Sequence, residues 1–156
     1  MVYRIRAAID DLIVGQLGTF NFPAGYYLYI GSAFGPGGVK CRTDRHLTAD
    51  TVKRWNIDYL KPFGEPVAVW WTTDPVKWEC RWAELVRQLP GGSVPAPEFG
   101  ARDCRKCAAH LYRFVRWPSF PVFTKMVAER LDGHGPVFLS QSTGIGSAEV
   151  GEAGHA

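Results

Sequence analysis

Residues 25–46 read GYYLYIGSAFGPGGVKCRTDRH, and this stretch says more about the fold than any other. Its first part is rich in aromatic and aliphatic side chains, which is typical of a β-strand. A glycine-rich turn at 35–38 follows and leaves room for a helix that begins at Val39. In such a helix Arg42 and His46 are four residues apart and share one face. The stretch therefore predicts a strand, a turn and a helix that bring tyrosine, arginine and histidine together.

The residues before and within this stretch predict three short strands. Val2 to Ala8, Leu12 to Leu17 and Tyr26 to Ile30 carry the aliphatic and aromatic side chains that strands favour. Asp10-Asp11 and the run 21–25 are turn signals between them. Short strands joined by tight turns predict a small antiparallel meander.

The rest of the chain predicts further helices around this sheet. Asp50 and Thr51 are candidate caps of a helix through Tyr59, and Asp74 and Pro75 open another helix through Leu89. Between them, 67–72 reads as a strand, 93–112 as a loop-rich segment, and 121–131 as a last helix. The expected class is therefore α+β, a small antiparallel β-sheet flanked by helices.

Composition predicts one domain with an appendage. We expect residues 1–112 to form the main domain, 113–140 to form an extension packed on it, and 141–156 to be a disordered tail, because that tail is rich in Gly, Ser and Ala. No apolar run approaches the roughly 20 residues needed to cross a membrane. Charged residues near the N-terminus do not fit a signal peptide, so we expect a cytoplasmic protein without membrane contacts.

Basic side chains cluster in two places. Residues 39–54 hold five basic against two acidic side chains, and residues 102–116 hold five basic against one acidic side chain. Such clusters suit a polyanion such as nucleic acid, although two solvated faces would look the same.

Four cysteines, Cys41, Cys80, Cys104 and Cys107, are present without a recognisable export signal, so disulfides are not expected. Two residues separate Cys104 from Cys107, and His110 follows closely. Zinc usually takes four ligands, and Cys80 could supply the fourth. A structural zinc site is one reading of this pattern, and buried or merely free thiols are the other.

Cleaving a phosphodiester bond requires activating a water, neutralising the phosphate and stabilising the leaving oxygen. A carboxylate-bound divalent metal, an arginine and a tyrosine or histidine can do this together. The candidates in this chain are Tyr3, Tyr29, Arg42, His46 and Glu79. Glu84 is a rival for the metal-binding carboxylate.

The order of these residues resembles the GIY-YIG endonucleases, and the small Uri-type branch most closely. That branch typically reads G-Y-Y-x-Y-x-G-S-A, R-x-x-R-H-L, W-H-I-D-Y-L, E-C and F-G-x-x-D-C with a nearby H-L. The resemblance covers roughly residues 2–112, and five motifs occur in the same order: Gly25-Tyr26-Tyr27-Leu28-Tyr29-Ile30-Gly31-Ser32-Ala33, Arg42-Thr43-Asp44-Arg45-His46-Leu47, Trp55-Asn56-Ile57-Asp58-Tyr59-Leu60, Glu79-Cys80, and Phe99-Gly100-Ala101-Arg102-Asp103-Cys104 with His110-Leu111.

The resemblance implies single-metal hydrolysis of DNA. Glu79 would bind Mg²⁺ or Mn²⁺, Arg42 would hold the scissile phosphate, and Tyr3 would help to deprotonate the water, with its pKa lowered by a nearby cation. Tyr29 would hydrogen-bond within the site, and His46 would assist proton transfer. The residues expected to contact substrate are Gly31, Ser32, Lys40 and Arg45.

Three departures from the pattern keep a second reading open. Val2 precedes Tyr3 without the glycine of a Gly-x-Tyr motif, the interval between Tyr3 and Tyr29 is long, and Asn56 replaces the histidine of the branch. A nucleic-acid-binding module of the same fold without catalysis is therefore one alternative. A zinc-stabilised interaction domain is the other. So small a domain predicts low sequence specificity, or a protein partner that targets it.

Overall fold

The computed structural model describes residues 1–48 and 52–141. Its centre is a six-stranded antiparallel sheet with the strand order β6-β7-β4-β1-β5-β8, and a separate two-stranded sheet pairs β2 with β3. The strands are β1 (Val2–Ile5), β2 (Ile9–Val14), β3 (Gly18–Phe22), β4 (Gly25–Tyr29), β5 (Glu65–Trp71), β6 (Gly92–Ser93), β7 (Leu111–Phe114) and β8 (Phe138–Gln141).

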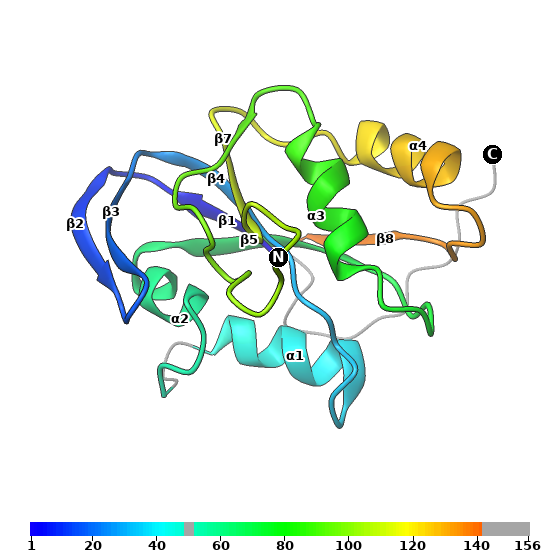
Figure 1. The fold of residues 1–156 in the computed structure, drawn as a ribbon, viewed down its shortest axis with the longest axis horizontal. Helices are drawn as coiled ribbons and strands as arrows, with labels where there is room; N and C mark the ends of the chain where they lie inside the picture. The colour runs from blue at the N-terminus through cyan, green and yellow to red at the C-terminus, as the bar shows by residue number, and fades with distance from the viewer. Residues whose placement is uncertain (49–51, 142–156) are drawn as a thin grey trace.

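Helices flank this sheet on both sides, which confirms the predicted α+β class. Figure 1 shows α3 and α4 on one side of the sheet and α1 and α2 on the other, with the β2–β3 hairpin at one end. The helices are α1 (Gly38–Leu47), α2 (Ile57–Leu60), which continues into the 3-10 turn η1 (Lys61–Phe63), α3 (Glu79–Arg87) and α4 (Phe120–Arg130).

The two faces of the sheet bury two separate apolar cores. Successive strand residues point to opposite faces, so Val2 and Tyr3 belong to different cores. Val2 packs with residues of α3 and α4, whereas Tyr3 and Tyr29 pack with the β2–β3 hairpin and α2. The alternation therefore directs the tyrosines that matter for the site to the face that α1 also approaches.

The predicted meander is wrong in its pairing. β1 lies in the middle of the sheet between β4 and β5, with Tyr3 opposite Tyr27 on one side and Pro66 on the other. β2 instead pairs with β3, because a tight turn closes locally between Val14 and Gly18. The first strand thus takes its partners from distant segments, and the hairpin is left outside the main sheet.

Two predicted helices are shorter than expected. Residues 52–56 are not helical, because the Asp58 carboxylate accepts hydrogen bonds from the backbone N–H groups of Arg54 and Trp55 and turns the chain there. Residues 75–78 are also not helical, because Asp74 accepts the backbone N–H groups of Val76 and Gly135 instead of capping a helix. The predicted caps at 50 and 51 lie outside the described residues.

The C-terminal part of the described chain joins the same sheet. Residues 113–140 include the end of β7, all of α4 and most of β8, and α4 contributes Phe123 and Val127 to the core under α3. Gln141 is the last residue of β8, and the rest of the predicted tail, 142–156, lies outside the described residues.

Candidate active site

A cavity of about 320 Å³ opens beside the turn that follows β4. Four segments form its wall: the turn itself, α1, the end of β5 with the following loop, and the start of α3. The predicted site residues that line it are Tyr29, Gly31, Ser32, Arg42, His46 and Glu79. Residues from motifs far apart in the sequence thus meet at one hollow.

Tyr3 lies behind the cavity and contacts His46. The Tyr3 hydroxyl is 2.9 Å from Nδ1 of His46, and both side chains are buried, with 1% and 5% of their surface exposed. Burial, aided by the nearby N-terminal amine and Arg42, lowers the pKa of His46 to about 2, so the imidazole is neutral near pH 7. The hydrogen bond fixes the ring in place.

The structure corrects the expectation of an acidified tyrosine. Burial raises the pKa of Tyr3 well above its usual value, and it raises the pKa of Tyr29 to about 12 while the nearby Arg42 guanidinium opposes the rise. Both phenols therefore keep their protons at neutral pH. Tyr3 is placed as a hydrogen-bond partner of His46 rather than as a free base.

Arg42 fills the space that Gly31 leaves open. A Cβ at position 31 would collide with the Arg42 guanidinium, so a larger residue there would displace this side chain from its present position. The guanidinium carbon also lies 4.6 Å from the ring centroid of Trp55. A cation held this way against an aromatic face can present its remaining N–H groups to an anion.

Trp55 organises the basic side chains of α1, which its sequence context did not predict. Arg45 lies 4.2 Å from the centroid of its ring, and the ring of His46 stacks at 6.4 Å with an interplanar angle of 24°. From sequence alone Trp55 favours an ordinary core position. Only tertiary structure, which brings the loop 52–56 over α1, shows its contact with the site.

Asp58 is buried next to Trp55 and Arg45, and several hydrogen bonds converge on its carboxylate. Its carboxylate accepts a hydrogen bond from Arg45 at 2.7 Å, besides those from the backbone N–H groups of Arg54 and Trp55. Arg45 is thus engaged with Asp58 and Trp55, and it does not line the cavity. Its role in the structure is to hold the loop over α1.

Lys40 and Asn56 are also occupied elsewhere. Lys40 pairs with Asp44 at 2.7 Å on the exposed side of α1 and does not line the cavity. The Asn56 side-chain oxygen accepts the backbone N–H of Gly100 at 2.9 Å. The residue in the histidine position of the resembled motif therefore ties its loop to the segment that leads to Cys104.

Glu79 stands at the start of α3, where its carboxylate faces both the cavity and the next segment. Oε1 is 3.5 Å from Nδ1 of His110, and Oε2 is 3.5 Å from Nζ of Lys77. Burial opposes ionisation, but the interactions with His110, Lys77 and the backbone N–H of Ser32 together outweigh it and lower the pKa of Glu79. The rival carboxylate, Glu84, instead pairs with Arg87 at 2.8 Å on the exposed side of the helix.

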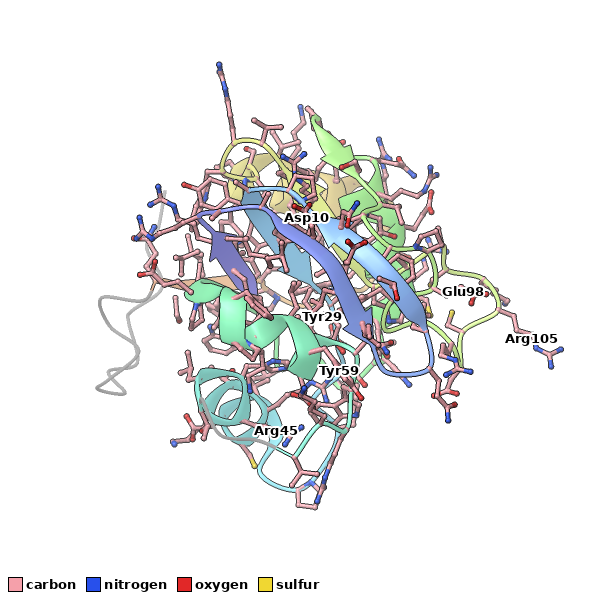
Figure 2. All side chains as sticks on the ribbon, turned by 90° about the vertical axis from the view of Figure 1, so that its left-hand side faces the viewer. Asp10, Tyr29, Arg45, Tyr59, Glu98 and Arg105 are labelled. Carbon is pink, nitrogen blue, oxygen red and sulfur yellow. The ribbon has the colours of Figure 1, made fainter. Side chains whose placement is uncertain are left out.

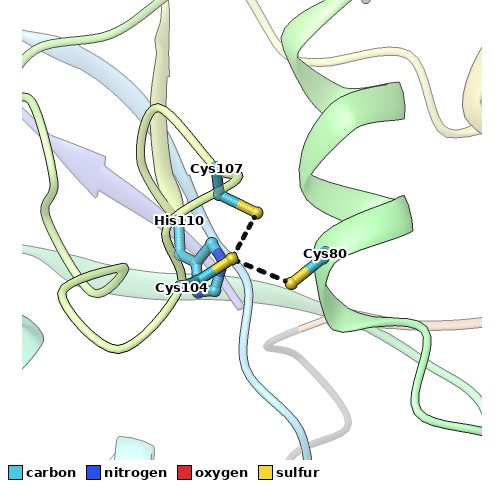
Figure 3. A group of neighbouring side chains, drawn as sticks. All are labelled: Cys80, Cys104, Cys107 and His110. Atoms are coloured by element: carbon cyan, nitrogen blue, oxygen red, sulfur yellow. Dashed lines mark hydrogen bonds between the residues drawn. The ribbon is translucent and has the colours of Figure 1, made fainter.

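Next to Glu79, four side chains gather into a group that could hold a metal ion. Cys80, Cys104, Cys107 and His110 each offer one ligand atom, and these atoms lie within 4.8 Å of one another (Figure 3). The Cys104 sulfur is 3.2 Å from both other sulfurs. Hydrogen bonds with the neighbouring Cys107 and Cys80 thiols lower the pKa of Cys104, which favours the thiolate that a metal would bind.

His110 supports a metal site because its buried ring nitrogens lack partners in the described part of the chain. Only 3% of its surface is exposed, and neither of its ring nitrogens has a hydrogen-bond partner among the described residues. A buried ring nitrogen without a partner costs free energy unless something binds it. A metal ion held with the three sulfurs would satisfy it, and three cysteines with one histidine are a common ligand set of structural zinc sites.

Comparison with protein families shows what this chain is related to. A family model described as a domain of unknown function, DUF123, matches residues 3–131, which include every element from the end of β1 to α4. Searches of curated proteins and of solved structures gave no match. None of the helices in the described part of the chain has the length and apolar character needed to span a membrane. The chain belongs to the DUF123 family.

Proposed function

We propose that this protein is a metal-dependent endonuclease that hydrolyses phosphodiester bonds in DNA. The observation that carries the proposal is that Tyr29, Arg42, His46 and Glu79 line one cavity. The resemblance of the motif order to GIY-YIG endonucleases supports it independently of the geometry. These side chains supply the positive charge, the proton acceptor and the carboxylate that the reaction requires.

Arg42 and Tyr29 would bind the scissile phosphate. The guanidinium carries a permanent positive charge and several N–H donors, which suit phosphate oxygens. Tyr29 keeps its proton because burial raises its pKa to about 12, so its hydroxyl can donate a hydrogen bond to the same group. Together they would fix the phosphate and offset the charge that develops on it.

His46 would accept the proton of the attacking water. Its imidazole is neutral in the free protein, which leaves it able to take up a proton. An anionic phosphate in the cavity would raise the pKa of His46, because a nearby negative charge favours the imidazolium. Tyr3 would keep the ring oriented through its 2.9 Å hydrogen bond.

Glu79 would hold Mg²⁺ or Mn²⁺ at the cavity. The Glu79 carboxylate suits such an ion because it is partly buried, has a lowered pKa and lies on the cavity wall. Mg²⁺ commonly uses one or two carboxylates together with substrate phosphate oxygens. When bound, such an ion supplies Lewis-acid stabilisation of the phosphate and the leaving oxygen.

The metal at Cys80, Cys104, Cys107 and His110 would be a structural zinc. Three sulfurs and one imidazole leave no open ligand position at a tetrahedral ion, which is typical of structural rather than catalytic sites. Thiols that hold zinc must stay reduced, so we place the protein in the cytoplasm.

Nucleic acid also fits the surroundings of the cavity. The far wall carries Trp71 and Trp78, and base rings stack on indole faces. Arg105 extends away from the loop that carries the cluster (Figure 2), and the neighbouring Arg102 and Lys106 are exposed as well. These charges could contact the phosphate backbone outside the cavity or a protein partner that targets the enzyme.

One observation favours a second candidate function, a nucleic-acid-binding module of the same fold without catalysis. His46 and Tyr3 are both buried, so a substrate must reach His46 through the cavity alone. If the cavity admits a phosphate but no attacking water, the basic side chains would bind nucleic acid without cleaving it.

A cleavage assay with matched variants separates the two functions. Supercoiled plasmid and labelled single-stranded and branched DNA would be incubated with the protein in Mg²⁺ or Mn²⁺. Cleavage lost in Glu79→Ala and kept in Glu84→Ala supports the nuclease. The zinc content of each preparation must be measured as well, because Glu79 also contacts His110. Salt-sensitive binding without cleavage by the wild type would instead indicate the binding module.

A further inference from the structure

We propose that Glu79 serves two sites at once, as the metal-binding carboxylate of the cavity and as the hydrogen-bond acceptor that orients His110 in the Cys₃His metal centre. The part that concerns the cavity rests on the proposed function. The part that concerns the metal centre rests on the geometry of the four ligands alone.

The first argument is the direction of the His110 ring. Nδ1 lies 3.5 Å from Oε1 of Glu79, and neither ring nitrogen of His110 has a hydrogen-bond partner among the described residues, so one nitrogen is available to a metal and the other to the carboxylate. A histidine that binds a metal through one nitrogen usually donates its other N–H to a carboxylate or carbonyl, which fixes the tautomer and raises the basicity of the ligand. Glu79 occupies that position.

The second argument is the connection through α3. Glu79 and Cys80 are consecutive residues in the first turn of the helix, so the carboxylate and one sulfur ligand are placed by the same backbone. The other ligands come from 104–110 on the opposite side (Figure 3). A metal ion would therefore join α3 to that loop and set where the Glu79 side chain points.

The third argument is that the two carboxylate oxygens of Glu79 have different neighbours. Oε1 is directed to His110, and Oε2 lies 3.5 Å from Lys77, whose side chain is 65% exposed. An exposed ammonium is an easily displaced partner, because such surface pairs contribute little to stability. Oε2 is thus the oxygen at which a divalent cation in the cavity would replace Lys77, while Oε1 stays with the histidine.

A metal ion bound at the Cys₃His centre would therefore determine the position of the Glu79 carboxylate in the cavity. With the metal bound, His110 has a fixed tautomer and holds Glu79 toward the cavity. Without it, neither the ring nor the carboxylate has that restraint. The zinc would then act on catalysis through the position of Glu79, without touching substrate.

The test is the zinc affinity of the protein, which requires no nucleic acid. Zinc would be titrated against a chromophoric chelator at pH 7 for the wild type, Glu79→Ala and Glu79→Gln, with Glu84→Ala as the control on the exposed side of the same helix. Loss of an outer hydrogen-bond partner weakens metal binding by about 10- to 100-fold in known sites. We expect a loss of that size in Glu79→Ala, a smaller loss in Glu79→Gln, and none in Glu84→Ala.

Cobalt provides a second readout of the same contact. Co²⁺ bound by three thiolates and an imidazole gives visible absorption, and the near-isosteric Glu79→Gln variant should shift that spectrum while its circular dichroism matches the wild type. Wild-type zinc affinity in both Glu79 variants, or failure of the wild type to bind zinc, would overturn the inference. Failure of the nuclease proposal would appear separately, as absent DNA cleavage by a protein with full zinc content.

Discussion

The cavity and the Cys₃His cluster are built in opposite ways, although they adjoin at Glu79. The cavity collects side chains from β4, α1 and α3, and a buried hydrogen bond joins His46 of α1 to Tyr3 of β1 behind it. The cluster takes three of its four ligands from the short segment 104–110. Its assembly is largely local, whereas the cavity exists only once the sheet has formed.

Because the two regions are built differently, we expect substitutions in the cavity and substitutions of buried supports to have different effects. Removing a charged group from the cavity should impair chemistry and leave the fold intact, because Arg42 and His46 lie on a helix that other residues anchor. Removing a buried support such as Asp58 should impair the fold first.

Arg42→Ala should lower the cleavage rate about 10²- to 10³-fold, because removing one preorganised donor to the developing charge costs that much in known enzymes. Zinc content and thermal stability should stay near wild type. Plasmid nicking rates measure the effect, and Lys40→Ala on the exposed side of the same helix is the control. Equal losses in the two variants would show that only the overall charge of α1 matters.

Asp58→Ala should destabilise the fold by about 3 kcal/mol, because it leaves Arg45 and two backbone N–H groups without their buried acceptor. Urea unfolding followed by circular dichroism measures the change. Asp44→Ala removes an exposed partner of Lys40 and should change stability by less than about 0.5 kcal/mol. A similar effect of both substitutions would contradict the role of Asp58 as a buried acceptor.

His46 should make the fold sensitive to acid. Its pKa is lowered to about 2 in the folded protein and is near 6.5 when unfolded, so the unfolded state binds the extra proton between these values. Stability is complete above about pH 6.5 and falls by up to about 1.4 kcal/mol per pH unit below it. Unfolding free energies at pH 7 and pH 5 should therefore differ by about 2 kcal/mol more in the wild type than in His46→Gln. Parallel pH profiles would refute the buried neutral imidazole.

Asn56→Ala should cost about 1 kcal/mol, because it removes one hydrogen bond to the backbone N–H of Gly100. Asn56→His introduces the histidine of the resembled motif and tests how stability depends on having asparagine at this position. Hydrogen exchange at Gly100 measures the contact, and it should accelerate in the alanine variant. Unchanged exchange there would show that this tie between the loop and the metal-binding segment is dispensable.

Local signals in the sequence predicted the elements of the fold better than their pairing. The aromatic run before Ile30 and the spacing of Arg42 and His46 specify a strand and a helix, and both form. The partners of β1 could not be predicted, since its neighbours β4 and β5 are about 25 and 65 residues away and any strand of the right pattern could have paired with it. The helices expected from Asp50 and Asp74 begin later than expected, at Ile57 and Glu79, because Asp58 and Asp74 accept hydrogen bonds from backbone that is not helical.

The candidate site shows the same division. Motif order led to six residues that line the cavity, whereas Tyr3, Lys40 and Arg45 were expected at the site and do not line it. The roles of Trp55 and Asn56 could not be predicted, because each depends on a contact with a segment remote in sequence. The burial that neutralises His46 and raises the pKa of Tyr3 is likewise a property of the packed fold and leaves no mark in sequence spacing.

The most direct test of the central claim is plasmid cleavage by protein with a measured zinc content, titrated with Mg²⁺ or Mn²⁺. Nicked product should form only when the cation is added, while the zinc content stays constant. It should be lost in Arg42→Ala and His46→Ala. A folded, zinc-loaded wild type that binds DNA and cleaves no substrate at any concentration of the cation would contradict that claim.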